Sequence, residues 1–121
     1  MNAPDVTIYH NPACGNSRGA LALIREAGIE PRVVEYLREP PDRATLQSLL
    51  TAMDLPARAL LREKEPACAE LGLDDPSLDE GALLDAMLSH PVLMQRPIVA
   101  TPLGTRICRP PETVLDLLPS R

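Results

Sequence analysis

The chain has 121 residues, a formal net charge of −5 at pH 7, and two tyrosines as its only aromatic residues. This length suits a single hydrophobic core, so we expect residues 1–121 to form one domain. An acidic chain almost without aromatic rings is a poor match for a nucleic-acid partner, which favours positive charge and base-stacking surfaces.

The sequence gives no sign of export or membrane insertion. No stretch approaches the roughly eighteen apolar residues of a membrane span, and the N-terminus lacks a basic segment followed by an apolar one. We therefore expect a cytoplasmic protein without a membrane partner. Its three cysteines lack Cys-x-x-Cys spacing, which predicts reduced thiols and no cysteine-built metal site.

The first 36 residues predict a strand, a helix and a second strand. Apolar, β-branched residues indicate a buried strand over 6–9, and a helix is expected over 20–25. Gly28 and Pro31 end that helix before a second strand over 32–36. Such a βαβ unit places its two strands parallel, with a right-handed crossover.

The middle of the chain, from about 42 to 90, has helical periodicity and no convincing strand. We expect a helical insertion there, with Asp42 or a neighbour capping its first helix. Proline is unfavourable inside a helix by about 3 kcal/mol. Four prolines therefore divide the insertion into short helices: Pro56, Pro66, Pro76 and Pro91.

The last third predicts a hairpin followed by a helix. Strands over 97–100 and 105–109 flank a turn at 102–104, and a helix with proline in its first turn is expected over 110–118. The complete order is that of an α/β thioredoxin-like fold, with a four-stranded mixed sheet and a helical insertion between the βαβ and ββα units. In that fold a proline, often cis, begins the third strand, so we expect a cis bond between Arg96 and Pro97.

Cys14 lies where the first strand hands over to the first helix. Unpaired amides and the positive end of the helix dipole at a helix N-terminus favour a negative charge, so this thiol is a candidate thiolate nucleophile. The same amides would hold an oxyanion presented to the sulfur. Cys68 lies among apolar residues of a predicted helix, and Cys108 alternates with arginines on a predicted strand. Both are expected to be inert core residues.

Neighbours of Cys14 refine its expected chemistry. Ser17 occupies the place of a second thiol in Cys-x-x-Ser, so the electrons must come from outside, with glutathione or a glutaredoxin-type partner as the natural source. Ser17 could instead be a first-turn helix residue. His10 could stabilise the thiolate as an imidazolium or be a structural residue. Arg18 gives Cys-x3-Arg, which is too short for the phosphate-wrapping Cys-x5-Arg loop of tyrosine phosphatases.

Three arginines are candidate ligands for a tetrahedral oxyanion. Arg62, Arg96 and Arg109 carry the planar, permanently charged donors that such an anion prefers. Sequence spacing does not show whether they converge, and taken singly each would be a solvated surface charge.

Five stretches closely resemble, in order and sequence, the glutaredoxin-coupled arsenate reductases of bacteria, the ArsC family: 10–18, 58–62, 90–93, 96–99 and 101–110. The resemblance extends from about Val6 to Pro119. It implies that Cys14 is the nucleophile and that Arg62, Arg96 and Arg109 hold arsenate and arsenite. It also implies that His10 and Ser17 tune the thiolate.

The resemblance implies covalent catalysis without a bound cofactor or metal. Cys14 would attack arsenate, glutathione would enter as co-substrate, and glutaredoxin would remove the glutathione and restore the thiol. The chain departs from well-known members of the family by ending at Arg121 without their polar C-terminal tail, which contains none of these residues.

Two other functions fit parts of the sequence. A glutathione-dependent thiol oxidoreductase without arsenate specificity would use Cys14 but not the arginines. A regulator of the Spx type would share the fold and bind RNA polymerase, although such proteins commonly carry Cys-x-x-Cys and lack the full arginine set.

Overall fold

The computed structural model describes residues 5–119. The chain divides into two compact units, a sheet unit formed by Met1–Glu39 with Arg96–Arg121 and a helical unit formed by Pro40–Gln95. No helix in the described part of the chain is long and apolar enough to cross a membrane. The expectation of one domain with an insertion over about 42–90 stays a prediction.

The sheet unit contains a four-stranded mixed sheet of order β2-β1-β3-β4. β1 is parallel to β2 and antiparallel to β3, and β3 is antiparallel to β4, as predicted for the βαβ unit and the hairpin. Each observed strand lies within one or two residues of its expected range: β1 (Thr7–His10), β2 (Arg32–Glu35), β3 (Ile98–Thr101) and β4 (Gly104–Ile107).

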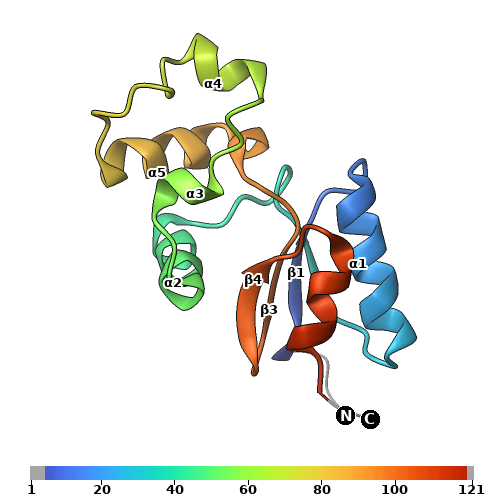
Figure 1. The fold of residues 1–121 in the computed structure, drawn as a ribbon. Helices are drawn as coiled ribbons and strands as arrows, with labels where there is room; N and C mark the ends of the chain where they lie inside the picture. Colours follow the sequence, from blue (N-terminus) through green and yellow to red (C-terminus); the bar gives the residue numbers. More distant parts are fainter. Residues whose placement is uncertain (1–4, 120–121) are drawn as a thin grey trace. The chain divides into compact units, whose positions relative to one another are not determined.

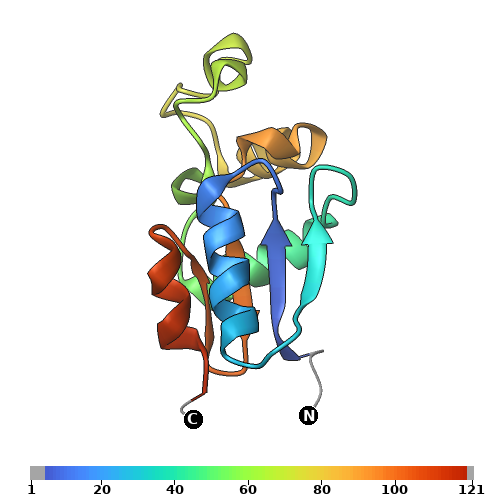
Figure 2. The same cartoon turned by 90° about the vertical axis from the view of Figure 1, so that its right-hand side faces the viewer.

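Two helices, α1 (Gly15–Glu26) and the 3-10 helix η3 (Pro111–Leu117), lie together on one face of this sheet (Figures 1 and 2). Side chains from α1 and η3 pack on strand residues such as Ile8 and Val99 to form the core. The helix expected over 110–118 is present over 111–117, and its geometry is that of a 3-10 helix. Pro110 and Pro111 stand at its start and Pro119 follows closely after its end, so prolines limit its length.

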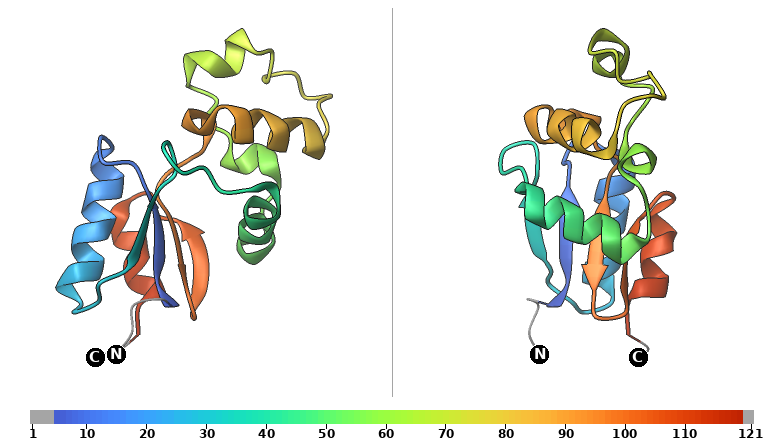
Figure 3. Two further views of the ribbon diagram at one scale, coloured as in Figure 1. Left: turned by 180° about the vertical axis from the view of Figure 1, so that it is seen from behind. Right: turned by 90° about the vertical axis from the view of Figure 1, so that its left-hand side faces the viewer.

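The helical unit is built around α5, which contacts both α2 and α3 (Figure 3). Its core includes Leu46 and Met87, and an ion pair between Arg43 and Asp85 links α2 to α5. Asp42 caps α2 as predicted, since its carboxylate accepts the Thr45 amide at 2.8 Å. The helices are α2 (Arg43–Met53), α3 (Ala57–Leu60), α4 (Pro66–Glu70), α5 (Glu80–Ser89) and the 3-10 helix η2 (Pro91–Leu93).

The contact between α1 and η3 makes Gly19 a sensitive position. A Cβ at Gly19 would lie 3.0 Å from Cγ and 3.1 Å from Cβ of Pro111, whose ring cannot turn away. We predict that Gly19→Ala lowers the free energy of unfolding by about 1 kcal/mol, because overpacking outweighs the better helix propensity of alanine. Urea denaturation measures this difference.

Gly15→Ala is the matched control for Gly19→Ala. A Cβ at Gly15 meets only an Arg18 nitrogen at 3.8 Å, which is ordinary contact. This variant should be neutral or slightly more stable than the parent chain. Equal stability changes in the two variants would contradict the packing argument.

Candidate active site

Residues 11–14 connect the end of β1 to the start of α1 in a tight turn. The Cys14 amide donates to the Asn11 carbonyl at 3.0 Å, and the Ala13 amide donates to Oδ1 of Asn11 at 2.9 Å. α1 then begins at Gly15, five residues earlier than the apolar pattern indicated. Cys14 is therefore the N-cap residue of α1, with extended backbone angles of φ −95° and ψ 124°.

The sulfur of Cys14 is half-buried at this helix start. Burial acts to raise the pKa of the Cys14 thiol, but the backbone amides of Ser17 and Asn16 and the guanidinium of Arg96 lower the pKa by more. The net effect is a pKa below the usual value for cysteine, as expected for a nucleophilic thiolate.

Arg96 supplies the positive charge beside this sulfur. It precedes Pro97 through a cis peptide bond, as predicted. Its Nε and Nη1 atoms are buried and have no hydrogen-bond partner. A buried donor without an acceptor is costly, so these atoms suit an anionic ligand that would satisfy them.

Arg109 lies at the same end of the sheet. Its Nη1 donates to the Arg96 carbonyl at 3.1 Å, and its side chain is otherwise exposed. The strand register explains this proximity. Ile98 lies opposite Ile107, so the residues two positions beyond this pair, 96 and 109, are neighbours. By contrast, Arg106 on β4 pairs with Asp116 of η3 and has a structural partner.

His10 and Ser17 form a buried pair behind the turn. Nδ1 of His10 lies 2.5 Å from Oγ of Ser17, and that oxygen also accepts the Asn11 amide at 3.0 Å. Burial, together with the nearby Arg25 and Arg18, lowers the pKa of His10 despite the opposing effect of Glu35. The imidazole is therefore neutral near pH 7, and the imidazolium considered from the sequence is not what the structure favours.

Arg62 belongs to the helical unit. Its amide donates to the Leu93 carbonyl at 2.6 Å, beside a bridge between Leu61 and Met94, so its backbone is fixed. Its Nε lies 3.6 Å from the Glu65 carboxylate, yet this buried nitrogen makes no hydrogen bond. That Arg62 binds substrate stays a prediction.

Arg58 belongs to the same motif, residues 58–62, but it makes structural contacts. Its guanidinium donates to the carbonyls of Leu73 and Asp75 at 3.1 and 2.8 Å and so holds the loop after α4. Arg18 is also engaged locally, since it donates to the Pro12 carbonyl at 2.9 Å. Neither arginine has the unsatisfied buried nitrogens seen at Arg96.

The other two thiols differ from Cys14. Cys68 and Cys108 are both buried, as the sequence predicted. Burial raises the pKa of Cys68, and it raises the pKa of Cys108 to about 12. Of the three thiols, only Cys14 therefore has a lowered pKa.

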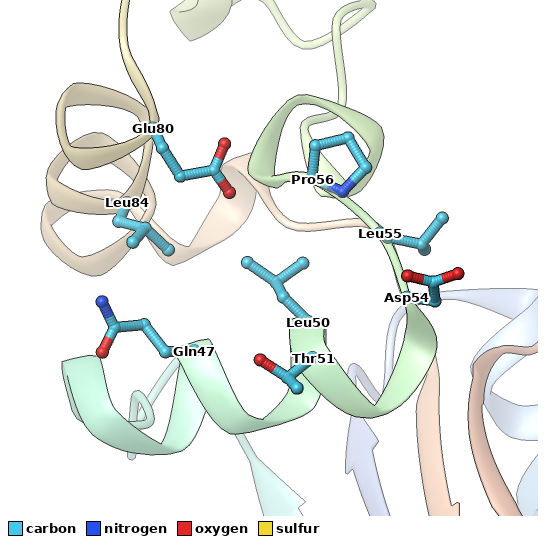
Figure 4. A pocket seen from close by; sticks show the side chains of 8 residues that line it. All are labelled: Gln47, Leu50, Thr51, Asp54, Leu55, Pro56, Glu80 and Leu84. Carbon is cyan, nitrogen blue, oxygen red and sulfur yellow. The ribbon is translucent and has the colours of Figure 1, made fainter.

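The helical unit contains a pocket of about 710 Å³ between α2, α5 and the start of α3 (Figure 4). No cysteine lines it, and its Glu80 carboxylate already accepts the Ala57 amide at 2.7 Å. Eight residues line it: Gln47, Leu50, Thr51, Asp54, Leu55, Pro56, Glu80 and Leu84. Across residues 5–119, no cluster of three or more His, Cys, Asp or Glu side chains could hold a metal ion.

One residue of the site, Asn11, was not singled out from the sequence, although it makes three of the hydrogen bonds that form the turn. The signal was the Asn-Pro pair at 11–12, because asparagine before proline favours a turn.

The chain is similar to known arsenate reductases along most of its length. It is 62% identical over 114 residues to an arsenate reductase of Rhizobium meliloti (strain 1021), covering 94% of this chain and 81% of the relative. It is 51% identical over 115 residues to an arsenate reductase of Escherichia coli (strain K12), covering 95% and 82%. The solved arsenate reductase of Vibrio cholerae superposes with a TM-score of 0.91 at 45% identity, covering 97% of this chain and all of that one.

The sequence profile of the ArsC family matches residues 9–117, which include Cys14 and all three candidate arginines. This match extends over nearly the whole chain, and the similar proteins share its fold. The chain therefore belongs to the ArsC family.

Proposed function

We propose that this protein reduces arsenate to arsenite, with Cys14 as the nucleophile. One observation carries the proposal: a thiol of lowered pKa lies beside an arginine whose buried nitrogens lack acceptors. A thiolate supplies the attacking atom, and the guanidinium supplies charge for a tetrahedral oxyanion. The names of the similar proteins agree with this chemistry.

In the first step, the Cys14 sulfur attacks arsenic. An As–S bond forms, one As–O bond breaks, and that oxygen leaves as water after gaining protons. One external thiol then forms a second As–S bond with loss of another water. A second external thiol attacks the sulfur of the first, so that bond to arsenic breaks, one disulfide forms and arsenic gains two electrons. Water finally displaces the Cys14 sulfur from arsenic, which breaks the first As–S bond, releases arsenite and restores the thiol. The net change is arsenate plus two thiols to arsenite, a disulfide and water. Because thiols supply both electrons, the reaction needs no bound cofactor or metal.

We assign substrate binding to Arg62, Arg96 and Arg109. The buried nitrogens of Arg96 and Arg62 that make no hydrogen bond support this assignment, although Nε of Arg62 also lies 3.6 Å from the Glu65 carboxylate; the hydrogen bond that holds Arg109 at the Arg96 carbonyl supports it as well. His10 and Ser17 would tune the thiolate indirectly, as the neutral pair that supports the turn.

We further propose glutathione and glutaredoxin as the reductants. Cys68 and Cys108 are buried, protonated thiols, so a resolving thiol must come from another molecule. A groove of about 540 Å³ lies beside the turn. Its lining is His10, Pro12, Arg18, Leu21, Ala22, Arg25 and Glu26. A reducing, cytoplasmic location would suit these partners.

We predict that Cys14→Ser abolishes turnover, because a hydroxyl at this position is not ionised near pH 7. The measurement is arsenate-dependent NADPH consumption in a mixture of glutathione, glutathione reductase and glutaredoxin. Cys68→Ser and Cys108→Ser serve as controls and should retain most activity. Turnover by Cys14→Ser would overturn the proposed mechanism.

We expect Arg96→Ala to lower kcat/KM for arsenate by about 10²-fold, the usual effect of removing one charged donor from an oxyanion site. The same variant should raise the pKa of Cys14, because the cation beside the sulfur is lost. Arg106→Ala removes an arginine that pairs with Asp116 and should change neither value. A thiol oxidoreductase without arsenate specificity would instead keep mixed-disulfide activity in Arg62→Ala and Arg96→Ala.

The reductant is tested by omission from the coupled assay. With arsenate and enzyme constant, leaving out either glutathione or glutaredoxin should stop NADPH consumption, and restoring it should bring turnover back. Full turnover with thioredoxin and thioredoxin reductase alone would contradict the assignment of reductants but leave Cys14 in place. Binding of RNA polymerase without arsenate turnover would favour a regulator instead.

A further inference from the structure

We propose that Asn11 is a positioning residue for Cys14: its side chain and backbone together fix the turn that keeps the sulfur beside the first amides of α1. This inference rests on the thiolate chemistry proposed above, and it adds a residue that does not touch the reacting atoms. It concerns only the sheet unit, where Asn11, Cys14 and Ser17 all lie.

Asn11 makes three hydrogen bonds that involve both ends of the turn. Its amide donates to Oγ of Ser17 at 3.0 Å, which ties the end of β1 to the first turn of α1. Its Oδ1 accepts the Ala13 amide at 2.9 Å, and its carbonyl accepts the Cys14 amide at 3.0 Å. The residue is 6% exposed, so water does not compete freely for these bonds.

These bonds decide which amides face the sulfur. The Cys14 amide donates to the Asn11 carbonyl, and the amides that lower the pKa of the sulfur are those of Ser17 and Asn16, in the first turn of α1. Cys14 must keep extended backbone angles to place its side chain at the helix start, and the turn imposes them. If the turn loosens, the sulfur loses a fixed position relative to those amides.

The carboxamide suits this task for a specific chemical reason. An Asx turn needs a short side-chain oxygen that accepts the amide two residues later, which both asparagine and aspartate provide. An aspartate would place a negative charge in the turn that carries the thiolate and would oppose its ionisation. Asparagine gives the same acceptor without the charge. Serine forms the equivalent turn more weakly.

The test measures the thiolate directly, in the full chain and without arsenate. Ultraviolet absorbance of the thiolate against pH gives the pKa of Cys14, and the rate of alkylation by iodoacetamide near neutral pH gives its reactivity. Cys14→Ser supplies the blank. The raised pKa values of Cys68 and Cys108 keep those thiols out of the signal.

We expect Asn11→Ala to slow alkylation about threefold or more, which corresponds to a rise of about half a pKa unit. Asn11→Ser, which retains a weaker acceptor, should fall between Asn11→Ala and the parent chain. This partial rescue separates a positioning role from a merely stabilising one, as does an unchanged KM for arsenate alongside a lowered kcat at neutral pH.

Thr101→Val is the matched control. Oγ1 of Thr101 accepts the amide two residues later, that of Leu103, at 3.0 Å, just as Asn11 does for Ala13. The strand register places Thr101 at the opposite end of the sheet from His10. Thr101→Val should lower stability without moving the pKa of Cys14.

Three outcomes would overturn the proposal. The first is a parental pKa in both folded Asn11 variants. The second is an equal pKa change in Thr101→Val. The third is loss of the folded state in both Asn11 variants by circular dichroism, which would assign Asn11 to the fold alone. A chain that reduces no arsenate but shows the expected pKa order would refute the proposed function and leave this inference intact.

Discussion

The chemistry of this protein depends on a balance of forces at one sulfur atom. Partial burial of Cys14 opposes its ionisation, while the amides of Ser17 and Asn16 and the charge of Arg96 favour it. The favourable contributions are larger, so the pKa of this thiol is lower than that of an ordinary cysteine. Each of them depends on precise placement, because dipole and charge effects at a helix start fall off within about one turn.

That placement comes from the register of the sheet. Tyr9 lies opposite Ile98, so the end of β1, which leads to Cys14, lies beside the start of β3, which follows Arg96. Ile98 in turn lies opposite Ile107, which brings Arg109 to the Arg96 carbonyl. A shift of one residue in either pairing would turn alternate side chains to the other face and separate these groups. The apolar core under α1 and η3 fixes this register, so packing and chemistry share the same constraint.

The fold was largely predictable because its signals are local. Strand and turn chemistry identified the βαβ unit, the hairpin and the Asp42 cap, and the position of Cys14 between strand and helix predicted its place at the start of α1 and its lowered pKa. The start of α1 was harder, since Gly15, Asn16 and Ser17 have weak helix propensity and tertiary packing decides their conformation. The charge state of His10 could not be predicted from the sequence either. It depends on how deeply the imidazole is buried beside Ser17, and residue spacing does not show burial.

The arginines and cysteines show most clearly that local sequence patterns do not predict the surroundings of a side chain in the folded protein. Arg58 and Arg62 belong to one short motif, yet Arg58 donates hydrogen bonds to two loop carbonyls, whereas the buried Nε of Arg62 makes no hydrogen bond and lies 3.6 Å from the Glu65 carboxylate. Cys14 and Cys108 are the same chemical group, yet burial without compensating donors raises the pKa of Cys108 to about 12 and makes it inert. Residue type therefore limits what a side chain can do. The hydrogen-bond partners that it finds or lacks in the fold decide which of those roles it can take. The groups that lower the pKa of Cys14 are the amides of Ser17 and Asn16 and the guanidinium of Arg96, and all of them belong to the sheet unit; Arg62 belongs to the helical unit and is not among them.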